Sequence, residues 1–207
     1  ISAQDSPLWL RRNAISPDGT QIAFTYKGDI YTVATEGGQA RQITTNPAYD
    51  SDPMWTDDSK TIVFSSYREG SKDIYKVSAK GGEPTRLTTH TGNETPMAVL
   101  ENNNGIIFSA AIQQDAQYGD FPGGTQLYQI GIDGGRPRQV TSLPISNISV
   151  RMDGTLLYED HKGYEDPWRK HHTSSVTHDI WIYVPSEKKK KVDISINGNG
   201  DFTKLTT

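Results

Sequence analysis

Several features are missing from this chain of 207 residues, and each absence excludes a class of protein. There is no cysteine, which excludes disulfides, cysteine-ligated zinc, iron–sulfur clusters and a thiol nucleophile. No apolar run approaches the roughly 18 to 20 residues that a membrane-spanning helix needs, so we expect no membrane insertion. A basic excess is missing too, because 21 Lys and Arg face 25 Asp and Glu and the net charge is −4. This balance argues against nucleic acid as the main partner.

The motifs of common catalytic sites are also absent. There is no Gly-x-Ser-x-Gly elbow, no His-Glu-x-x-His zinc helix and no complete phosphate-binding glycine loop. Ser174, Ser175, His178 and Asp179 include the residue types of a nucleophile, a base and an orienting acid. Catalytic triads are assembled from groups that the fold places, and four near-adjacent residues cannot easily adopt that geometry. We therefore predict that the chain itself is not catalytic and holds no cofactor.

The chain does contain a fourfold internal repeat. Each copy starts with a turn such as Asp-Gly, a short apolar run and a triplet like Asp-Ile-Tyr. A Gly-Gly pair and a final pair like Leu-Thr follow, although an interruption replaces Gly-Gly in the fourth copy. The aromatic residue of the triplet is Tyr31, Tyr75, Tyr128 or Trp181, at separations of 44, 53 and 53 residues. Copies in a fixed internal order are typical of a repeat architecture.

The repeat predicts an all-β fold. Each copy has short β-branched or aromatic runs bounded by turn residues, which is the pattern of strands joined by tight turns. A unit of about 40 to 50 residues with four antiparallel strands is one blade of a β-propeller. A β-sandwich would explain the strands but not the repeat. We predict one domain over residues 1–207, a β-propeller or propeller segment with four blades at about 8–45, 46–89, 90–142 and 143–207.

The four strands of each blade, called A to D in chain order, can be placed on the repeat. Strand A, which lines the channel, is predicted near 11–15, 53–55, 96–100 and 145–150. Aromatic residues on strands B and C are predicted to pack one blade against the next. Those of strand B are Phe24, Phe64, Phe108 and Tyr158. Strand D is predicted to end in Thr44, Thr88, Thr141 and Thr206.

Two long interruptions indicate where binding occurs. Both 111–125 and 161–178 connect strand B to strand C, in neighbouring blades. In alternating antiparallel strands the B–C and D–A connections lie at the same end of the channel, so the two loops should lie side by side. Long loops in a compact domain are commonly functional. We expect this end to bind peptides or partners, beside channel-lining residues from strand A: Arg11, Arg12, Met54, Trp55, Met97 and Arg151.

The second interruption is rich in histidine and charge, which allows three interpretations. Imidazole and carboxylate groups could hold a divalent metal, but their spacing matches no compact ligand pattern. A solvated loop without function is the second interpretation. We favour the third, a hydrogen-bonded loop that caps the channel or contacts a neighbouring domain, and we predict no metal. Its candidate binding residues are His161, Tyr164, Glu165, Asp166, Trp168, Arg169, His171 and His172.

The repeats resemble the WD-like repeats of TolB and of tricorn-type proteases, in which Ser-Pro-Asp-Gly, Asp-Ile-Tyr and a final Leu-Thr recur. Segments 7–19 and 162–176 resemble bacterial tricorn protease homologues more specifically. The resemblance implies the N-terminal propeller of a large serine-type peptidase, whose PDZ-like domain and protease core lie outside this chain. It further implies that the propeller guides or gates peptides, that it contacts other domains of its parent, and that the location is the periplasm or cell envelope. Any oligomer is expected to form through the parent.

Propellers of that family usually have six or seven blades, whereas four repeats are present here. We therefore expect a fragment of a longer ring; a ring closed by four blades is the alternative. A protein-interaction module of the cell envelope, similar to TolB, is the alternative function. A stand-alone enzyme is a third hypothesis, and it requires turnover by the isolated chain.

Overall fold

The computed structural model describes residues 10–101, 104–112, 125–141, 145–151, 154–160, 179–185 and 200–204. Apart from one isolated residue, the regular secondary structure within these ranges consists entirely of β-strands. The part of the chain so described contains no helix long and apolar enough to cross a membrane. The expectation of an all-β fold is thus confirmed.

The strands form four antiparallel sheets of four strands each, one sheet for each sequence repeat. The first contains β1 (Arg11–Ile15), β2 (Gln21–Tyr26), β3 (Asp29–Ala34) and β4 (Arg41–Gln42). The second contains β5 (Asp50–Trp55), β6 (Thr61–Ser66), β7 (Asp73–Ser78) and β8 (Thr85–Arg86). The third contains β9 (Glu94–Leu100), β10 (Gly105–Ala110), β11 (Gln126–Gly131) and β12 (Gly134–Thr141). The fourth contains β13 (Ile145–Val150), β14 (Leu156–Asp160), β15 (Ile180–Pro185) and β16 (Gly200–Lys204).

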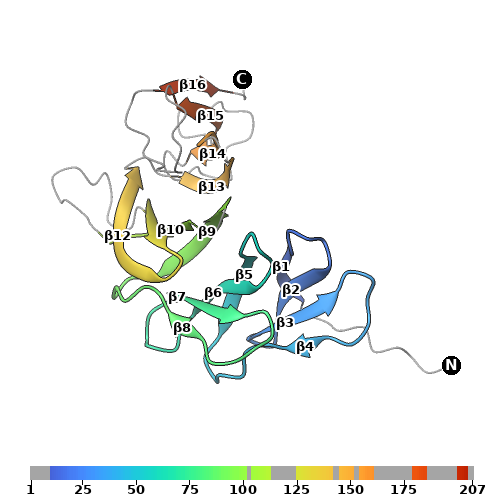
Figure 1. The fold of residues 1–207 in the computed structure, drawn as a ribbon. Coiled ribbons are helices and arrows are strands. Elements are labelled where there is room, and N and C mark those ends of the chain that lie inside the picture. The colour runs from blue at the N-terminus through green and yellow to red at the C-terminus, as the bar shows by residue number, and fades with distance from the viewer. Residues whose placement is uncertain are drawn as a thin grey trace, which may run out of the picture.

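The four sheets are the blades of a propeller. They follow one another along an arc, with the first strand of each blade on the inner side and the fourth on the outer side (Figure 1). Neighbouring inner strands contact each other, β1 with β5, β5 with β9 and β9 with β13. Strand A therefore lines the inner side, as its position in the repeat predicts.

The A–B turns show why the Asp-Gly and Asp-Ser pairs recur. The carboxylate of Asp18 accepts hydrogen bonds from the Ser16 hydroxyl at 2.6 Å and from the Thr20 amide at 3.0 Å. The next residue, Gly19, has a φ of 72°, and Ser59 at the same position of the second blade has a φ of 57°. Both lie in the left-handed region, which glycine adopts without strain. The hydrogen bonds of the carboxylate stabilise this conformation. The Asp-Gly or Asp-Ser pair therefore produces a tight turn.

Strand D is shorter than predicted in the first two blades, where β4 and β8 end before Thr44 and Thr88. The hydroxyls of these threonines accept the amide protons of Ile30 and Ile74, each at 2.9 Å. A side-chain oxygen thus replaces the backbone partner that a longer strand would supply. In the third blade β12 extends to Thr141, as expected.

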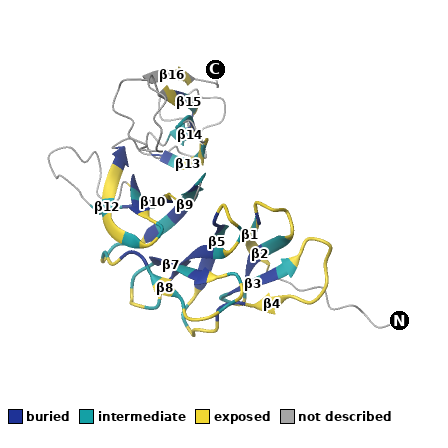
Figure 2. Cartoon of the chain, viewed as in Figure 1, coloured by how far each residue is buried: buried dark blue, intermediate teal, exposed yellow. Residues whose placement is uncertain are grey.

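The hydrophobic core lies between the blades. Three clusters of buried residues each span one junction: Ala23 and Ile30 pack against Trp55 and Phe64 at the first. Corresponding clusters join the second blade to the third and the third to the fourth. In Figure 2 the buried residues accordingly lie along the facing sides of neighbouring blades. Each blade is therefore stabilised mainly by its neighbours.

The aromatic residues of strands B and C stack within each of the first three blades. The ring centroids of Phe64 and Tyr75 are 5.9 Å apart and those of Phe108 and Tyr128 are 5.8 Å apart. Phe64 and Phe108 are completely buried, each at a junction with the preceding blade. These contacts confirm the packing role that the repeat predicted.

Candidate functional site

The antiparallel register brings the B–C and D–A connections to one end of the molecule. In the third blade Glu94 begins β9 and pairs with Ala110, the last residue of β10. Ala110 pairs in turn with Gln126, the first residue of β11. The fourth blade repeats this relation, since Ile145 pairs with Asp160. We call this end of the molecule the B–C face. The B–C and D–A connections meet here, as the sequence predicts.

Both long loops start and finish on the B–C face. Around the second loop the amide of Asp160 donates to the carbonyl of Asp179 at 3.0 Å, and the amide of Asp179 donates to Asp160 Oδ1 at 2.8 Å. Residues 113–124 and 161–178 themselves lie outside the described part of the chain. Eight of the predicted binding residues lie in the second of these segments and therefore stay predictions: His161, Tyr164, Glu165, Asp166, Trp168, Arg169, His171 and His172.

Two β-bulges on the B–C face bring opposite charges together. The register of β1 shifts at Arg12, and the register of β5 shifts in the segment that contains Asp52. Both residues have left-handed backbones, with φ of 47° and 54°. Bulges redirect side chains, and here Arg12 Nε lies 3.3 Å from Asp52 Oδ1. The ion pair joins the inner strands of the first and second blades.

Asp52 is the centre of a charge network that extends over three blades. Lys72 Nζ lies 2.8 Å from Asp52 Oδ2, and it donates to the hydroxyl of Thr95 on β9 at 3.1 Å. The Ser51 hydroxyl donates to Asp52 Oδ2 at 2.9 Å. Burial by itself favours the neutral acid, but the hydrogen bond and charge of Lys72 lower the pKa of Asp52 below its usual value. The carboxylate is therefore ionised and holds both cations at the inner rim.

Deeper acidic residues follow the same pattern at the blade junctions. Asp50 is fully buried, and its Oδ2 lies 2.8 Å from Arg68 Nη2. Asp73 is fully buried as well, and its Oδ2 lies 2.9 Å from Arg86 Nη2. Glu94 is also completely buried, and burial raises its pKa to about 7. Because the charge of Asp73 adds to this effect, the junction between the second and third blades contains a carboxyl group that titrates near neutral pH.

The predicted channel residues of the second and third blades are partly used for packing. Trp55 is 6% exposed, and its indole Nε1 donates to the carbonyl of Ala14 at 3.0 Å. It is part of the core between the first and second blades. Met54 and Met97 are half-buried, and Met97 packs against the core between the third and fourth blades. Trp55 thus couples two blades, whether or not a ligand enters the channel.

The predicted arginines do not form one cluster. Arg11 and Arg12 are exposed near the start of the first blade's inner strand, on the B–C face. Arg151 is exposed too, but it follows β13 at the opposite end of the fourth blade's inner strand. The structure therefore brings Arg12 together with Asp52 and places Arg151 at the other mouth.

Sequence reasoning did not single out Asp52 or Glu94. A signal was present, because acids stand at the start of strand A in two successive blades: Asp50 and Asp52 before Pro53, and Glu94 two residues before Pro96. By register Glu94 corresponds to Asp50, since each pairs with the last residue of strand B. The importance of these acids depends on burial between blades, which the local sequence does not reveal.

Metal binding has no support among the described residues. Within them, no group of three or more His, Asp or Glu side chains could hold a metal ion. The histidine-rich loop lies outside that part, so the metal interpretation of that loop stays untested.

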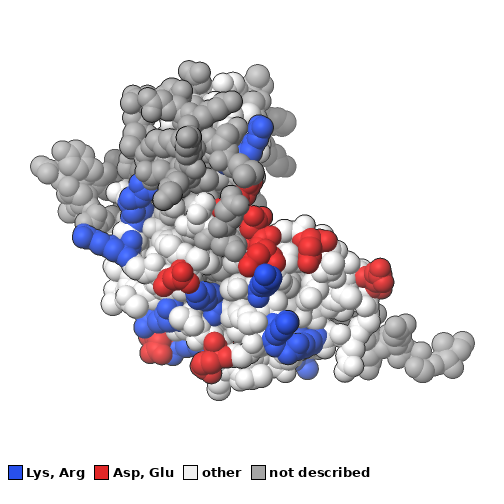
Figure 3. Space-filling model, viewed as in Figure 1, with Lys and Arg blue, Asp and Glu red and all other residues white. Residues whose placement is uncertain are grey.

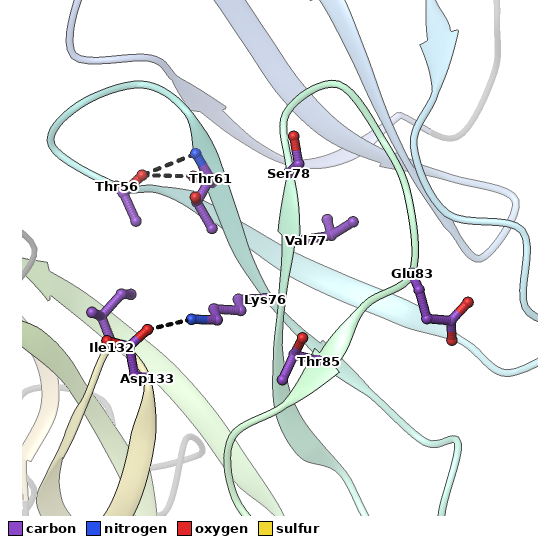
Figure 4. A pocket seen from close by; sticks show the side chains of 9 residues that line it. All are labelled: Thr56, Thr61, Lys76, Val77, Ser78, Glu83, Thr85, Ile132 and Asp133. Carbon is purple, nitrogen blue, oxygen red and sulfur yellow. Dashed lines mark hydrogen bonds and ion pairs between the residues drawn. The ribbon is translucent and has the colours of Figure 1, made fainter.

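A separate hollow lies between the second and third blades at the opposite end of the molecule (Figure 4). Its volume is about 290 Å³. Across it Lys76 Nζ lies 2.7 Å from Asp133 Oδ1, and the side chain of Asp133 is 89% exposed. The hydroxyl of Thr56 accepts the amide proton of Thr61 at 3.0 Å. Most of the lining residues are polar: Thr56, Thr61, Lys76, Val77, Ser78, Glu83, Thr85, Ile132 and Asp133.

Positive and negative side chains are interspersed over the visible face of the first three blades (Figure 3). This mixture agrees with the small net charge. Repeated four-stranded sheets and cores between blades together define a β-propeller domain, with a polar network at one mouth.

Comparison with known proteins gives the family. Residues 7–202 match the tricorn protease N-terminal β-propeller domain, and the chain belongs to this family. The fold is similar to that in the crystal structure of the tricorn protease, with a TM-score of 0.67 and 22% sequence identity. That likeness covers 98% of this chain and 18% of the tricorn protease chain.

TolB proteins are similar as well. A crystal structure of TolB from Acinetobacter baumannii has a TM-score of 0.65 and 18% identity, over 96% of this chain and 43% of that one. The Tol-Pal system protein TolB of Anaeromyxobacter dehalogenans (strain 2CP-C) is 40% identical over 57 residues, which are 24% of this chain and 13% of TolB. Each of these matches covers less than half of the relative's own length.

Proposed function

We propose that this chain is a non-catalytic propeller domain of a tricorn-like peptidase, which guides or gates peptide access to a protease core outside the chain. The family match over residues 7–202 carries the proposal. The geometry supports it, because both long loops are anchored on the B–C face, around the inner strands. A channel narrowed by loops would admit an unfolded peptide and exclude a folded protein.

The experiment removes residues 164–176 from the full-length parent protein. We expect that the shortened parent degrades a folded protein faster, relative to an unstructured peptide, than the intact parent does. The control is Lys76→Ala, a substitution in the hollow at the opposite end, and it should leave this ratio unchanged. Unchanged turnover and size selectivity after the deletion would contradict the gating role.

The second candidate is a protein-interaction module of the cell envelope. The likeness to TolB over 96% of the chain favours it. An immunoblot of fractionated source cells separates the two functions. A band several times larger than 22.9 kDa supports a domain of a larger peptidase, whereas a band at that mass in the periplasmic fraction supports the separate module.

A further inference from the structure

Two exposed tyrosines lie next to each other on the B–C face. Tyr49 directly precedes Asp50 and Tyr67 directly follows Ser66, and these last two residues are paired across β5 and β6. The tyrosines therefore leave the second blade from adjacent strands. Their exposed fractions are 46% and 43%, unlike the buried aromatic residues of the blade junctions. Large exposed aromatic side chains are typical of binding surfaces.

The first blade supports this pair from the side. The amide of Asp50 donates to the carbonyl of Gly28 at 2.7 Å, so the turn at Lys27 and Gly28 lies against the start of β5. A Cβ atom on Gly28 would lie 3.4 Å from Tyr49 Cδ2, which shows that the ring rests on this turn. Lys27 is exposed, and its Nζ lies 5.3 Å from the centroid of the Tyr26 ring. Aromatic and cationic groups thus share one surface.

Two exposed cations belong to this surface. Lys27 is exposed, and the side chain of Arg12 is 74% exposed. The acids beneath them are already paired: Asp50 with Arg68, and Asp52 with Lys72 and Arg12. Two acids share this end of the molecule: Glu69, which is exposed, and half-buried Asp29, which accepts a hydrogen bond from Gln42 at 3.0 Å. We name this set of Arg12, Lys27, Tyr49 and Tyr67 the tyrosine surface.

Backbone strain gathers at the same place. Four described residues other than glycine have a left-handed backbone: Arg12, Lys27, Asp52 and Ser59. The first three lie on or directly beneath the tyrosine surface, and only Ser59 belongs to an A–B turn. Such conformations cost about 1 kcal/mol or more and cluster at ligand-binding sites. Arg12 and Lys27, two of these residues, carry the exposed cations of the tyrosine surface.

We propose that the tyrosine surface binds an extended peptide segment that is acidic and carries large apolar side chains. Carboxylates of the segment pair with Arg12 and Lys27, while its apolar side chains pack on Tyr49 and Tyr67. The inference rests on the proposed function, since it specifies which unfolded segments the propeller receives. It adds Lys27, Tyr49 and Tyr67 to a face otherwise assigned through its long loops and through residues of strand A such as Arg12.

The test measures binding by fluorescence anisotropy, with the 207-residue chain and a fluorescein-labelled peptide of about twelve residues that alternates Glu and Phe. Comparison peptides replace Glu by Lys or Phe by Ser. We expect each comparison peptide to bind about tenfold more weakly, because each loses one half of the recognition. Binding should also weaken as salt is raised.

Variants then assign the binding to this surface. The double variant Tyr49→Ala with Tyr67→Ala should weaken binding about tenfold, whereas Tyr49→Phe with Tyr67→Phe should retain it, because the ring and not the hydroxyl makes the contact. Lys27→Gln should weaken binding of the Glu-Phe peptide and reduce its salt dependence. Lys76→Ala, a cation at the opposite end, is the matched control. Urea unfolding of each variant verifies that the fold is intact.

Equal binding of the three peptides, or unchanged binding by the double alanine variant, would overturn the proposal. Tighter binding of a single-stranded oligodeoxythymidine or of anionic lipid vesicles than of the Glu-Phe peptide would overturn it as well. These outcomes would leave the proposed function unaffected, because the size selectivity of the parent tests it separately.

Discussion

At the scale of residues, this protein places ionisable groups inside the blade junctions. Asp50, Asp73 and Glu94 are all completely buried, although such residues are almost never buried without a partner. Arg68 and Arg86 supply the countercharges for the two aspartates. Stability should therefore depend strongly on these few positions.

Replacing the buried cation Arg68 by leucine should destabilise the chain by about 3 kcal/mol, because a buried carboxylate is left without its countercharge. The guanidinium also lies 5.5 Å from the ring centroid of Phe64 and 5.2 Å from that of Tyr75. Adding Asp50→Asn should recover part of the loss. Urea unfolding of the single and double variants measures this coupling, and a loss below about 1 kcal/mol for Arg68→Leu would contradict it.

Glu94 should make the protein less stable as the pH rises. Its pKa in the folded chain is about 7 and its ordinary value is 4.5, so the folded state binds this proton more tightly than the unfolded state. The free energy of unfolding should therefore fall between about pH 4.5 and 7 and stay constant above. Glu94→Gln should flatten this slope and stabilise the chain at pH 8 by at most about 3 kcal/mol.

The measurement for Glu94 is urea unfolding at several pH values. Asp133→Asn is the matched control, because that exposed carboxyl makes only a surface ion pair. An unchanged slope in Glu94→Gln would show that another group is responsible.

At the scale of elements, the blades repeat in their turns and differ in their inner strands. The A–B turns of the first two blades use the same hydrogen bonds, with Asp18 and Asp58 as acceptors. The bulges of the inner strands instead occur at different pairs, near Arg12 in β1 and between the partners of Ile107 and Phe108 in β9. Turn chemistry could be predicted from the sequence because it is local. The bulges could not, since they depend on what each strand contacts.

Gly105→Ala should destabilise the third blade severely. Gly105 has a φ of 151°, and an added Cβ would lie 2.5 Å from the carbonyl oxygen of Ile130. The clash is with backbone, so β10 and β11 would have to separate. We expect a loss of at least about 2 kcal/mol in urea unfolding.

The control for Gly105 is Gly82→Ala, where φ is 121° and no atom lies within 4 Å of the added Cβ. That variant suffers backbone strain alone, about 1 kcal/mol. Equal losses in the two glycine variants would show that the close approach at Gly105 is relieved at no cost.

At the scale of the whole molecule, the far side of the fourth blade resembles a junction without the next blade. Leu157 and Ile180 occupy the register positions of Val63 and Ile74, which are completely buried against the third blade. In the fourth blade these positions are 42% and 41% exposed. This difference favours the expectation that the four blades belong to a longer ring.

A matched pair of substitutions tests this expectation. Ile74→Thr should cost about 3 kcal/mol in the 207-residue chain, because a fully buried apolar group is lost. Ile180→Thr should cost less than about 1 kcal/mol, since its side chain is already in partial contact with water. In the full-length parent the two costs should become similar. A persistently small cost for Ile180→Thr would favour four blades without a fifth.

Sequence reasoning was sufficient for the features that neighbouring residues specify. The repeat of Asp-Gly turns, strand-forming runs and stacked pairs such as Phe64 with Tyr75 led to the blade, to the strand order and to the end at which the long loops lie. It was not sufficient for the network around Asp52. Arg12, Asp52 and Lys72 come from three separate segments, and each alone has the sequence pattern of an ordinary surface charge. They meet because hydrophobic packing between blades sets the distance between their strands, and that distance is a property of the folded chain.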